Sequence, residues 1–478
     1  MSTIGLHLLG EKEKNLIHQS SLAILEKIGI LVPDREISEL LQENKAQKKG
    51  DRLLLPSSLV EESIAKAGKS FSVYGRDGER SVHFALGKTI FCSSPGQFAW
   101  FEGAKRREPQ RQDFLQAIHV AHHLAHIDLL GGLAMPLDIP PSFRELYMVK
   151  ELFTYTDKPI FVWFSEPQHF RSAFEMSVIL TGNQREAVEK PRFFAFLEPI
   201  SPLRFPQKGL AILKEATTLG LPVMIGPMAQ SGATAPVTLA GTLAQENAEI
   251  LASITITQLL SPGTPICYGG IPHIADPRTG SISFGSPEQA LLSLAMAEIG
   301  ATLYHFPVYI NTGLTDSLAL DPQNGWEKGI TLILGMLAGA TTFGHMGIVG
   351  CDQGGSITQL VLDNELISFC KRIVHGIEVN QDTLAIDEIA SGVQEGTFLV
   401  LPHTVRFFRR ELWLPELSTR GTFREEDVSL IERAKTRVEN LLASPLPLLP
   451  ETKRKELETY FIEITGAFEL LNQNPEVL

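Results

Sequence analysis

The chain has 478 residues, of which 44% are hydrophobic and 20% are charged, so it can build a large core and is not expected to be disordered. Acidic side chains outnumber basic ones by 55 to 42, giving a net charge of −13. This balance argues against a nucleic-acid or anionic-membrane partner, because both require a basic surface. The cysteines at 92, 267, 351 and 370 are too widely spaced for a disulfide scaffold or a zinc ribbon or finger. The N-terminus does not resemble a signal peptide, and no run of 18 apolar residues occurs, so we expect a cytoplasmic protein.

The pattern of the first 88 residues predicts a small cap. Apolar residues at helical spacing predict a helix over 11–30, and a second helix is expected within 53–69, closed by Gly68. The alternating segment 71–84 contains Asp77-Gly78, which predicts a β-hairpin. We therefore expect residues 1–88 to form an N-terminal cap of helices and a hairpin.

From Thr89 onward one unit recurs: a short apolar run, a turn rich in Gly or Pro, and a helix. The eight apolar runs cover 89–94, 127–134, 159–165, 192–198, 222–228, 265–270, 306–311 and 341–346. Eight units in 288 residues give 36 residues each, which fits an α/β protein built as a (β/α)8 TIM barrel. A doubly wound sheet is the competing fold, but it would carry a GxGxxG turn after its first strand, and none is present. We assign 89–378 to the barrel and 379–478 to a C-terminal helical extension that packs on the barrel and on a neighbouring subunit.

In a (β/α)8 barrel the active site lies where the strands end, so the residues that close each apolar run are the candidates. Aromatic side chains are concentrated there, and Glu198 and Asp316 accompany them. Aromatic faces together with carboxylates suit a cation that cannot donate hydrogen bonds, such as a quaternary ammonium ion. The alternative is that these rings serve as packing inside the barrel. The aromatic set comprises Phe98, Trp100, Trp163, Phe164, Phe196, Tyr268 and Tyr309.

Three further features allow more than one interpretation. The Gly-rich run 344–356 opens a helix and could bind phosphate through backbone N–H groups or act as a lid. The segment 93–110 predicts a small hairpin that serves as a lid or a docking surface.

Four histidines at i, i+3, i+4 and i+7 have a spacing that can bind zinc, but we expect a solvated face of an outer helix without function; they are His119, His122, His123 and His126. We expect no metal site, and Cys267 and Cys351 are interpreted as buried thiols.

Several segments together resemble the trimethylamine:corrinoid methyltransferase superfamily, over about residues 10 to 420. They are IHQSSLAILEKIGILV (17–32), SSPGQFAWFEG (93–103), NTGLTDSLALD (311–321), HMGIVGCDQGGSITQLVLDNELI (345–367) and HGIEV (375–379). The resemblance implies transfer of a methyl group from an amine to the cob(I)alamin of a separate corrinoid protein. Archetypal members carry pyrrolysine, whereas this chain has an ordinary residue at every position; the equivalent position is expected near Asp316 to Leu318.

The resemblance is therefore to the pyrrolysine-lacking branch, similar to glycine betaine:corrinoid methyltransferases. A quaternary ammonium has no lone pair to add to an imine. Transfer of its methyl group needs positioning and desolvation rather than a general acid. Carnitine, proline betaine or another quaternary amine is an alternative substrate. A lyase or a binding protein is the more remote alternative. A lyase should need a lysine or a metal at a strand end, and we find no lysine there. We also expect a homo-oligomer.

The residues that the resemblance suggests for substrate binding fall into three groups. Trp163, Tyr268 and Tyr309 would supply the faces of an aromatic cage, and Glu198 or Asp316 the counter-charge. A donor to the substrate carboxylate would come from His273, Asn311, His345 or Arg278.

Overall fold

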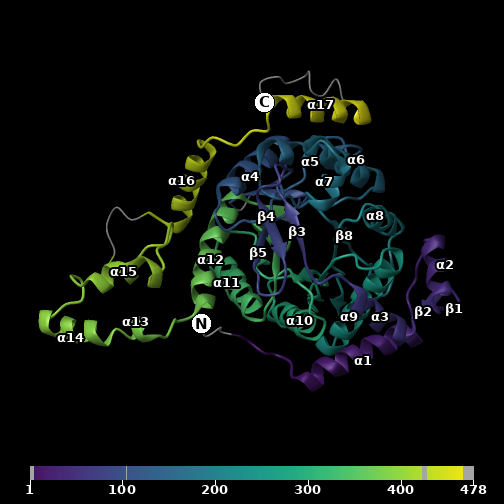
Figure 1. Ribbon diagram of the computed structural model, residues 1–478, viewed down its shortest axis with the longest axis horizontal. Helices are drawn as coiled ribbons and strands as arrows, with labels where there is room; N and C mark the ends of the chain where they lie inside the picture. Colours follow the sequence, from purple (N-terminus) through teal and green to yellow (C-terminus); the bar gives the residue numbers. More distant parts are fainter. Residues whose placement is uncertain (1–4, 104, 423–427, 467–478) are drawn as a thin grey trace.

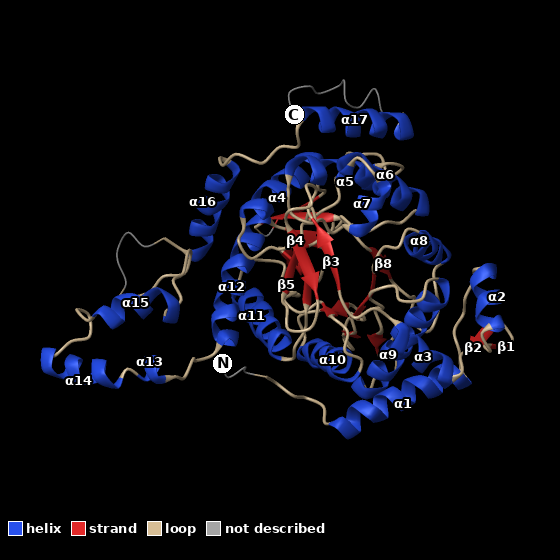
Figure 2. Ribbon diagram, in the orientation of Figure 1, coloured by secondary structure: helices blue, strands red, loops and turns tan. Residues whose placement is uncertain are grey.

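The computed structural model describes residues 5–103, 105–422 and 428–466. It is an α/β fold in which helices surround a curled parallel sheet (Figures 1 and 2). The sheet has six strands in the order β5-β15-β14-β11-β9-β8, and every neighbouring pair is parallel. Six of the eight predicted apolar runs form these strands: β5 (Ile90–Ser93), β8 (Ala195–Leu197), β9 (Val223–Ile225), β11 (Ile266–Gly269), β14 (Val308–Ile310) and β15 (Thr342–Met346).

The other two predicted strands, 127–134 and 159–165, are not ladder strands. They make isolated parallel bridges, Cys92 to Leu129, Gln97 to Ala134 and Leu130 to Ile160, which continue the order of the sheet beyond β5. Gly131 lies so close to the residue after β5 that a Cβ there would be 2.2 Å from the Ser94 carbonyl oxygen. Backbone hydrogen bonds, such as Ser93 N to the Leu129 carbonyl at 3.1 Å and Leu133 N to the Ser94 carbonyl at 2.9 Å, join the two segments without a regular ladder. The observed architecture is thus a curled parallel half-barrel sheet with two further segments in barrel order.

The helices between the strands form an outer layer, as the repeated unit predicts. One of them, α9 (Leu239–Leu260), is buried on nearly all sides because the N-terminal helices cover it. The remaining helices of this layer are α4 (Arg111–His123), α5 (Arg144–Tyr155), α6 (Pro167–Thr181), α7 (Gln184–Glu189), α8 (Gln207–Thr218), α10 (Pro287–Glu298) with a π-helical turn η1 (Ile299–Leu303), α11 (Pro322–Leu337) and α12 (Ile357–His375).

The N-terminal region contains the predicted elements and three others. The helix predicted over 11–30 is α1 (Glu11–Lys27), and the one within 53–69 is the shorter α3 (Ser57–Lys66). Between them lie α2 (Arg35–Glu43) and a hairpin of β1 (Gln47–Lys49) and β2 (Arg52–Leu54). Helices α1 and α3 both pack on α9, which accounts for its burial.

The predicted hairpin over 71–84 is confirmed as β3 (Phe71–Tyr74) paired antiparallel with β4 (Ser81–Phe84). Figure 1 shows it in the middle of the ring of helices. Phe71 and Phe84 stack with centroids 4.4 Å apart, and Phe84 packs edge-on against Phe194 at 5.7 Å, just before β8. The hairpin therefore closes the amino end of the sheet, opposite the end where the functional loops lie.

The C-terminal region divides into two parts. Helices α16 (Leu430–Leu442) and α17 (Glu451–Thr465) pack on the body, against α4 and α12 and against α5 and α6 respectively. By contrast, α13 (Gln381–Leu384), α14 (Ile386–Glu395) and α15 (Pro402–Glu411) extend away from the body (Figure 1). Among the helices in the described part of the chain, none is long and apolar enough to cross a membrane.

Candidate active site

Four rings from four different strand segments meet at the carboxyl end of the sheet. Trp163 lies 6.0 Å from Phe196, and Phe196 lies 5.9 Å from Tyr309, between ring centroids. The Tyr309 Oη is 3.4 Å from the His345 Nδ1, and the His345 ring is 5.4 Å from Trp163. The circuit of Trp163, Phe196, Tyr309 and His345 is closed, and we call it the four-ring cluster.

Glycines on neighbouring strands make room for these rings. A Cβ at Gly226 would be 2.6 Å from the Phe196 Cζ, and a Cβ at Gly344 would be 2.6 Å from the Tyr309 Oη. A side chain at either position would push a ring out of place, since real Cβ contacts are longer than this. The alternation of ring and glycine across adjacent strands therefore determines which rings can point inward.

His345 joins the cluster because the strand is irregular there. The register of β15 with β5 shifts between Phe343 and Met346. His345 has φ +65°, a backbone conformation that residues other than glycine rarely adopt. Its Nδ1 lies 2.9 Å from the Asn311 Oδ1, so the ring donates from Nδ1. Burial lowers its pKa to about 3, which makes His345 a neutral imidazole.

Two buried nitrogens of the cluster lack a hydrogen-bond partner in the residues that the structure describes. They are the Trp163 Nε1, a donor, and the His345 Nε2, an acceptor in this tautomer. Leaving such an atom unpaired costs about 1–3 kcal/mol, so buried polar atoms are nearly always satisfied. Two exceptions on adjacent rings are typical of a place where a ligand or a water molecule supplies the missing partners.

Two carboxylates with raised pKa values accompany the rings. Burial raises the pKa of Glu198, just after β8, to about 7, although the residue remains open to solvent. The pKa of Asp352 is likewise raised to about 7, chiefly by burial and also by the charge of Glu198, although a hydrogen bond from Gln97 opposes the rise. The two groups are electrostatic neighbours, and both also act on the Tyr309 hydroxyl. The sequence interpretation did not assign Asp352 a role; it stands in the Gly-rich run, where φ +61° suits Asp better than most side chains.

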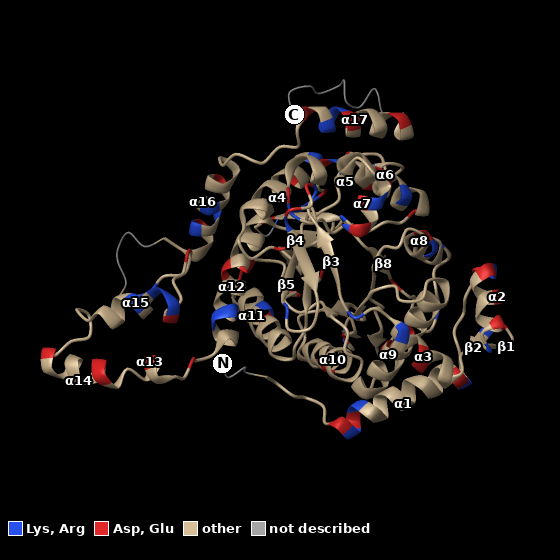
Figure 3. Cartoon of the chain, in the orientation of Figure 1, with Lys and Arg blue, Asp and Glu red and all other residues tan. Residues whose placement is uncertain are grey.

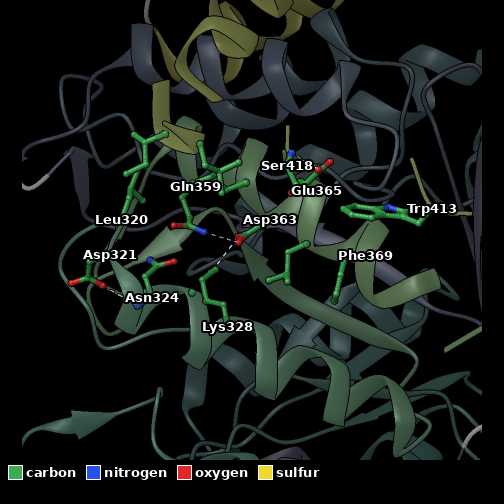
Figure 4. A pocket seen from close by; sticks show the side chains of 15 residues that line it. Leu320, Asp321, Asn324, Lys328, Gln359, Asp363, Glu365, Phe369, Trp413 and Ser418 are labelled. Carbon is green, nitrogen blue, oxygen red and sulfur yellow. Dashed lines mark hydrogen bonds and ion pairs between the residues drawn. The ribbon is translucent and has the colours of Figure 1, made fainter. Parts of the chain in front are cut away.

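A buried ion pair braces the loops that carry Asn311 and His345. The Lys328 Nζ donates to the Gly313 carbonyl at 2.6 Å and to the Ile348 carbonyl at 3.1 Å, and it lies 3.2 Å from the Asp363 carboxylate. Asp363 in turn accepts from the Gly347 N at 2.7 Å. Lys328 and Asp363 border a cavity of about 250 Å³ between α11 and α12, which Trp413 closes on one side (Figure 4).

Five of the nine residues proposed for substrate binding come together here, and four do not. Trp163, Tyr309, Asn311, His345 and Glu198 lie in or beside the four-ring cluster. Tyr268 points the opposite way: its Oη donates to the Asn247 Oδ1 at 2.8 Å, and its ring stacks on Phe306. In the run PICYGG it is Cys267 that faces the sheet interior, so the strand alternation turns Tyr268 into the helical layer.

Asp316, His273 and Arg278 are used elsewhere. The Asp316 carboxylate accepts from the Phe284 N at 2.8 Å and from the Ser283 hydroxyl, which ties the loop after β14 to β13 (Ile282–Ser283). His273, on β12 (His273–Ala275), bonds the Ile271 carbonyl at 2.9 Å and packs on Phe284. The Arg278 side chain is 87% exposed and pairs with Asp276.

The Gly-rich run is not a phosphate cradle. Its N–H groups already donate within the protein: Gly347 to Asp363, Gly350 to the Ser317 carbonyl and Cys351 to the Thr315 carbonyl. The run forms a hairpin of β16 (Ile348–Val349) and β17 (Gly354–Gly355). It pairs with β6 (Ala99–Glu102), whose partner β7 (Lys105–Arg107) completes the small hairpin predicted for 93–110. The two segments thus form one four-stranded sheet beside the site.

The expected solvated face of histidines is wrong. His119 bonds the Ser444 carbonyl at 2.7 Å, and His122 bonds the Thr156 hydroxyl at 3.0 Å, so this face of α4 is half-buried. Burial lowers the pKa of His122 to about 3 and of His126 to about 4. Within residues 5–103, 105–422 and 428–466, no group of three or more His, Cys, Asp or Glu side chains is placed to hold a metal ion.

Comparison with known proteins defines the class first. Solved structures share the fold: a hydroxylamine complex of MtmB has a TM-score of 0.54 at 12% identity, covering 95% of this chain and 88% of that one. The monomethylamine methyltransferase of Methanosarcina barkeri has a TM-score of 0.51 at 12% identity, covering 92% and 93%. The fold is therefore the one found in a methylamine methyltransferase.

Sequence comparison defines the family. The model of the trimethylamine methyltransferase (MTTB) family matches residues 3–465, and the chain belongs to this family of methyltransferases that act on methylated amines. The chain is 30% identical over 457 residues to a glycine betaine methyltransferase of Desulfitobacterium hafniense strain Y51, covering 94% of this chain and 95% of the relative. It is 29% identical to a trimethylamine methyltransferase of Desulfitobacterium hafniense strain DSM 10664 / DCB-2 (93% and 91%) and 30% identical to that of Methanosarcina thermophila (84% and 85%).

Proposed function

We propose that this protein transfers a methyl group from a quaternary amine, with glycine betaine as the first choice, to the cob(I)alamin of a separate corrinoid protein. The observation that carries the proposal is the four-ring cluster with Glu198 and Asp352 beside it. Ring faces and carboxylates stabilise a cation that has no N–H to donate. The likeness to a glycine betaine methyltransferase over 94% of the chain supports the same substrate class.

The reaction requires the protein mainly to position the substrate. The cobalt(I) electron pair attacks the methyl carbon, the C–N bond breaks, and nitrogen keeps the bonding pair as it leaves. Glycine betaine thus becomes neutral-nitrogen dimethylglycine, and the cobalt becomes methylcobalt(III). No proton moves in this step, so an acid–base pair is not needed, and the neutral His345 is consistent with that requirement.

The residue roles follow from the geometry. Phe196 and Tyr309 present rings to the trimethylammonium head, and Glu198 and Asp352 supply the counter-charge. The unpaired Trp163 Nε1–H donates to the substrate carboxylate, a role that the sequence interpretation gave to other residues. Asn311 is a positioning residue, since its side chain orients the His345 ring.

We further propose that the eight segments close a (β/α)8 barrel over 89–378, between an N-terminal cap (1–88) and a C-terminal extension (379–478). The Phe161 and Phe194 rings lie 5.5 Å apart, and Trp163 and Phe196 lie 6.0 Å apart, which brings segment 159–165 beside β8 and supports closure. Catalysis would proceed without pyrrolysine and in the cytoplasm, where cobalt(I) is protected from oxidation.

The corrinoid partner would dock where the strands end. The connecting segments after five different strands of the central sheet present an exposed apolar side chain there, and such a set is typical of a contact surface. The residues are Phe98 (62% exposed), Ile200 (45%), Val237 (76%), Ile282 (43%) and Leu318 (59%).

The test is a methyl-transfer assay with purified protein, a reduced corrinoid protein and a panel of amines. With glycine betaine we expect the absorbance of methylcobalt(III) to appear together with equimolar dimethylglycine. Faster transfer from carnitine or proline betaine would keep the chemistry and change the substrate. Transfer from trimethylamine alone, or from no member of the panel, would contradict the proposal.

The pKa values of the two carboxylates predict how activity depends on pH. Both have pKa values near 7, so their negative charge is lost as the pH falls through 7, and kcat/KM for a quaternary amine should fall with it. Glu198→Gln should raise KM and remove part of this dependence. Steady-state kinetics from pH 5.5 to 8.5 measure both effects, and a flat profile in the unmodified enzyme would contradict the assignment.

The same substitution should affect stability in the opposite sense. A carboxyl whose pKa is raised in the folded state favours folding least at high pH, where it must be charged, and most below its unfolded pKa near 4.5. Glu198→Gln should therefore raise Tm by about 1–3 °C at pH 8 and by less at pH 5, since solvent access limits the penalty. Glu43→Gln, on the exposed end of α2, is the matched control and should change neither Tm nor kinetics.

A further inference from the structure

The cavity between α11 and α12 is separate from the four-ring cluster, and none of the four rings lines it. Its wall combines the first two turns of α11, one face of α12 and C-terminal residues that include Ser418 and Ile431. Its volume is about 250 Å³. Since a cavity of about 150 Å³ can hold benzene, this one has room for about ten non-hydrogen atoms. The cavity is therefore large enough for a small organic molecule.

Two buried amide side chains present unpaired atoms in this wall. Asn324 and Gln359 are only 5% and 3% exposed. In the part of the chain that the structure describes, the Asn324 Nδ2, a donor, and the Gln359 Oε1, an acceptor, have no hydrogen-bond partner. The orientation of Gln359 is fixed, because its Nε2 donates to the Asp363 Oδ1 at 2.7 Å and a carboxylate can only accept. The cavity thus offers one free donor and one free acceptor.

Helical spacing brings the two amides to the same end of the cavity. Asn324 lies one turn before Lys328 on α11, and Gln359 lies one turn before Asp363 on α12. The Lys328 Nζ and the Asp363 carboxylate are 3.2 Å apart, and α11 packs against α12, so the preceding turns of the two helices also face each other. A single polar group can therefore meet both amides.

The other end of the cavity is apolar. The Trp413 ring is held by a hydrogen bond from its Nε1 to the Ser368 hydroxyl at 2.9 Å, and it packs edge-on against Phe369 with centroids 5.2 Å apart. Figure 4 shows Asn324 and Gln359 on one side of the cavity and these two rings on the other. Leu362 and Leu366 continue the apolar wall. Water can pair with the amides but finds no partners along this wall, so an apolar group suits it better.

The four charged side chains that border the cavity already have partners. Lys328 pairs with Asp363. Asp321 accepts from the Ser317 hydroxyl at 2.8 Å, and Glu365 accepts from the backbone N–H groups of residues 417 and 418 at 3.1 and 2.9 Å. Helices α11 and α12 together carry three acidic and three basic residues (Figure 3). An ion would therefore gain no free counter-charge here, and a neutral ligand is favoured.

We propose that this cavity binds a small neutral molecule whose polar end donates and accepts side by side, as a primary amide does, and whose body is aromatic or aliphatic. Its oxygen accepts from the Asn324 Nδ2, its N–H donates to the Gln359 Oε1, and its body lies against Leu366 and Trp413. Because Gln359 is bonded to Asp363, the ligand also stabilises the ion pair that braces the loops after β14 and β15. The proposal does not depend on the methyl donor or on the corrinoid partner.

Calorimetric titration of the full chain with benzamide is the first test. We expect one site per chain with a Kd of about 1 mM, as suits a ligand of about nine non-hydrogen atoms. Benzoate has the same shape but is charged and has no N–H, so it should bind at least about tenfold more weakly. Asn324→Ala removes the free donor and keeps the backbone N–H that bonds Asp321, so it should weaken benzamide binding about tenfold without lowering Tm.

Two further variants locate the binding. Leu366→Trp fills the cavity and should abolish the binding of benzamide, whereas Asn440→Ala, on the exposed side of α16, is the matched control and should leave it unchanged. Far-UV circular dichroism should be the same for all variants. No binding of benzamide, equal binding of benzoate, or binding that survives both Asn324→Ala and Leu366→Trp would overturn the proposal.

Hydrogen exchange measured by mass spectrometry tests the link to the ion pair. The Gly347 N–H donates to Asp363 at 2.7 Å, so benzamide should slow exchange in residues 345–350 about twofold to tenfold. Exchange in the β3–β4 hairpin, at the other end of the sheet, should not change. Binding of benzamide with unchanged exchange in residues 345–350 would overturn the link between the cavity and these loops.

Discussion

Replacing Trp163 with leucine should lower kcat/KM for glycine betaine by about two to three orders of magnitude. The substitution removes one ring of the four-ring cluster, worth about 0.5–2 kcal/mol to a bound cation, and the hydrogen bond to a charged carboxylate, worth about 1.5–3 kcal/mol. Trp163→Phe keeps a ring and removes only the Nε1–H, so the loss should be about tenfold to a hundredfold. Steady-state kinetics of methyl transfer measure both.

A substrate without a carboxylate separates the two contributions. With tetramethylammonium or choline, Trp163→Phe should behave nearly as the wild type, while Trp163→Leu should remain impaired. Phe164→Leu is the matched control, because Phe164 is the next residue but packs outward on Phe170 and Phe193. Equal losses from Trp163→Phe with betaine and with tetramethylammonium would contradict the role of the Trp163 N–H.

The second large effect is expected at Lys328. Its side chain and that of Asp363 are each 1% exposed, so Lys328→Met leaves a buried carboxylate without its counter-charge. Removing one partner of such a pair typically destabilises a protein by about 3–5 kcal/mol. The Gly313 and Ile348 carbonyls also lose their donor, so the loops carrying Asn311 and His345 should lose their fixed positions. Thermal and guanidinium unfolding measure the stability, and the betaine KM reports the loops.

A compensating substitution makes this prediction specific. Lys328→Met combined with Asp363→Leu removes both charges and should recover much of the stability, because an apolar pair avoids the desolvation penalty. It should not recover the KM, since Asp363→Leu removes the acceptor of the Gly347 N, which holds the loop after His345. A change in Tm of less than about 1 °C for Lys328→Met alone would show that the pair does not brace these loops.

Local pattern was sufficient for the order of elements in most of the chain. Apolar runs of six to eight residues between helices predicted six of the sheet strands, and the Asp77-Gly78 turn predicted the β3–β4 hairpin. The runs 127–134 and 159–165 have the same composition and yet form only isolated bridges. Composition reports whether a segment is buried, but a ladder forms only where the hydrogen bonds to the neighbouring strand keep a regular register.

In the candidate site, too, the local sequence pattern predicts only part of the arrangement. Strand alternation alone turns Tyr268 outward once Cys267 and Gly269 are placed inward, and it turns Tyr309 inward, although the two tyrosines read alike in sequence. Alternation would also turn His345 away, but the bulge in β15 brings it into the cluster. No local signal marks a bulge of this kind, because it depends on how the strand meets β5.

The sequence by itself determined the family, the repeated strand–helix unit and the presence of aromatic and acidic residues where strands end. These are properties of local pattern and of similarity along the chain. Only the tertiary structure decided which rings face one another, that Asp352 joins Glu198, and that α13, α14 and α15 extend away from the body. Each of these depends on contacts between residues far apart in the chain, where a shift of one position in register reverses the direction of a side chain.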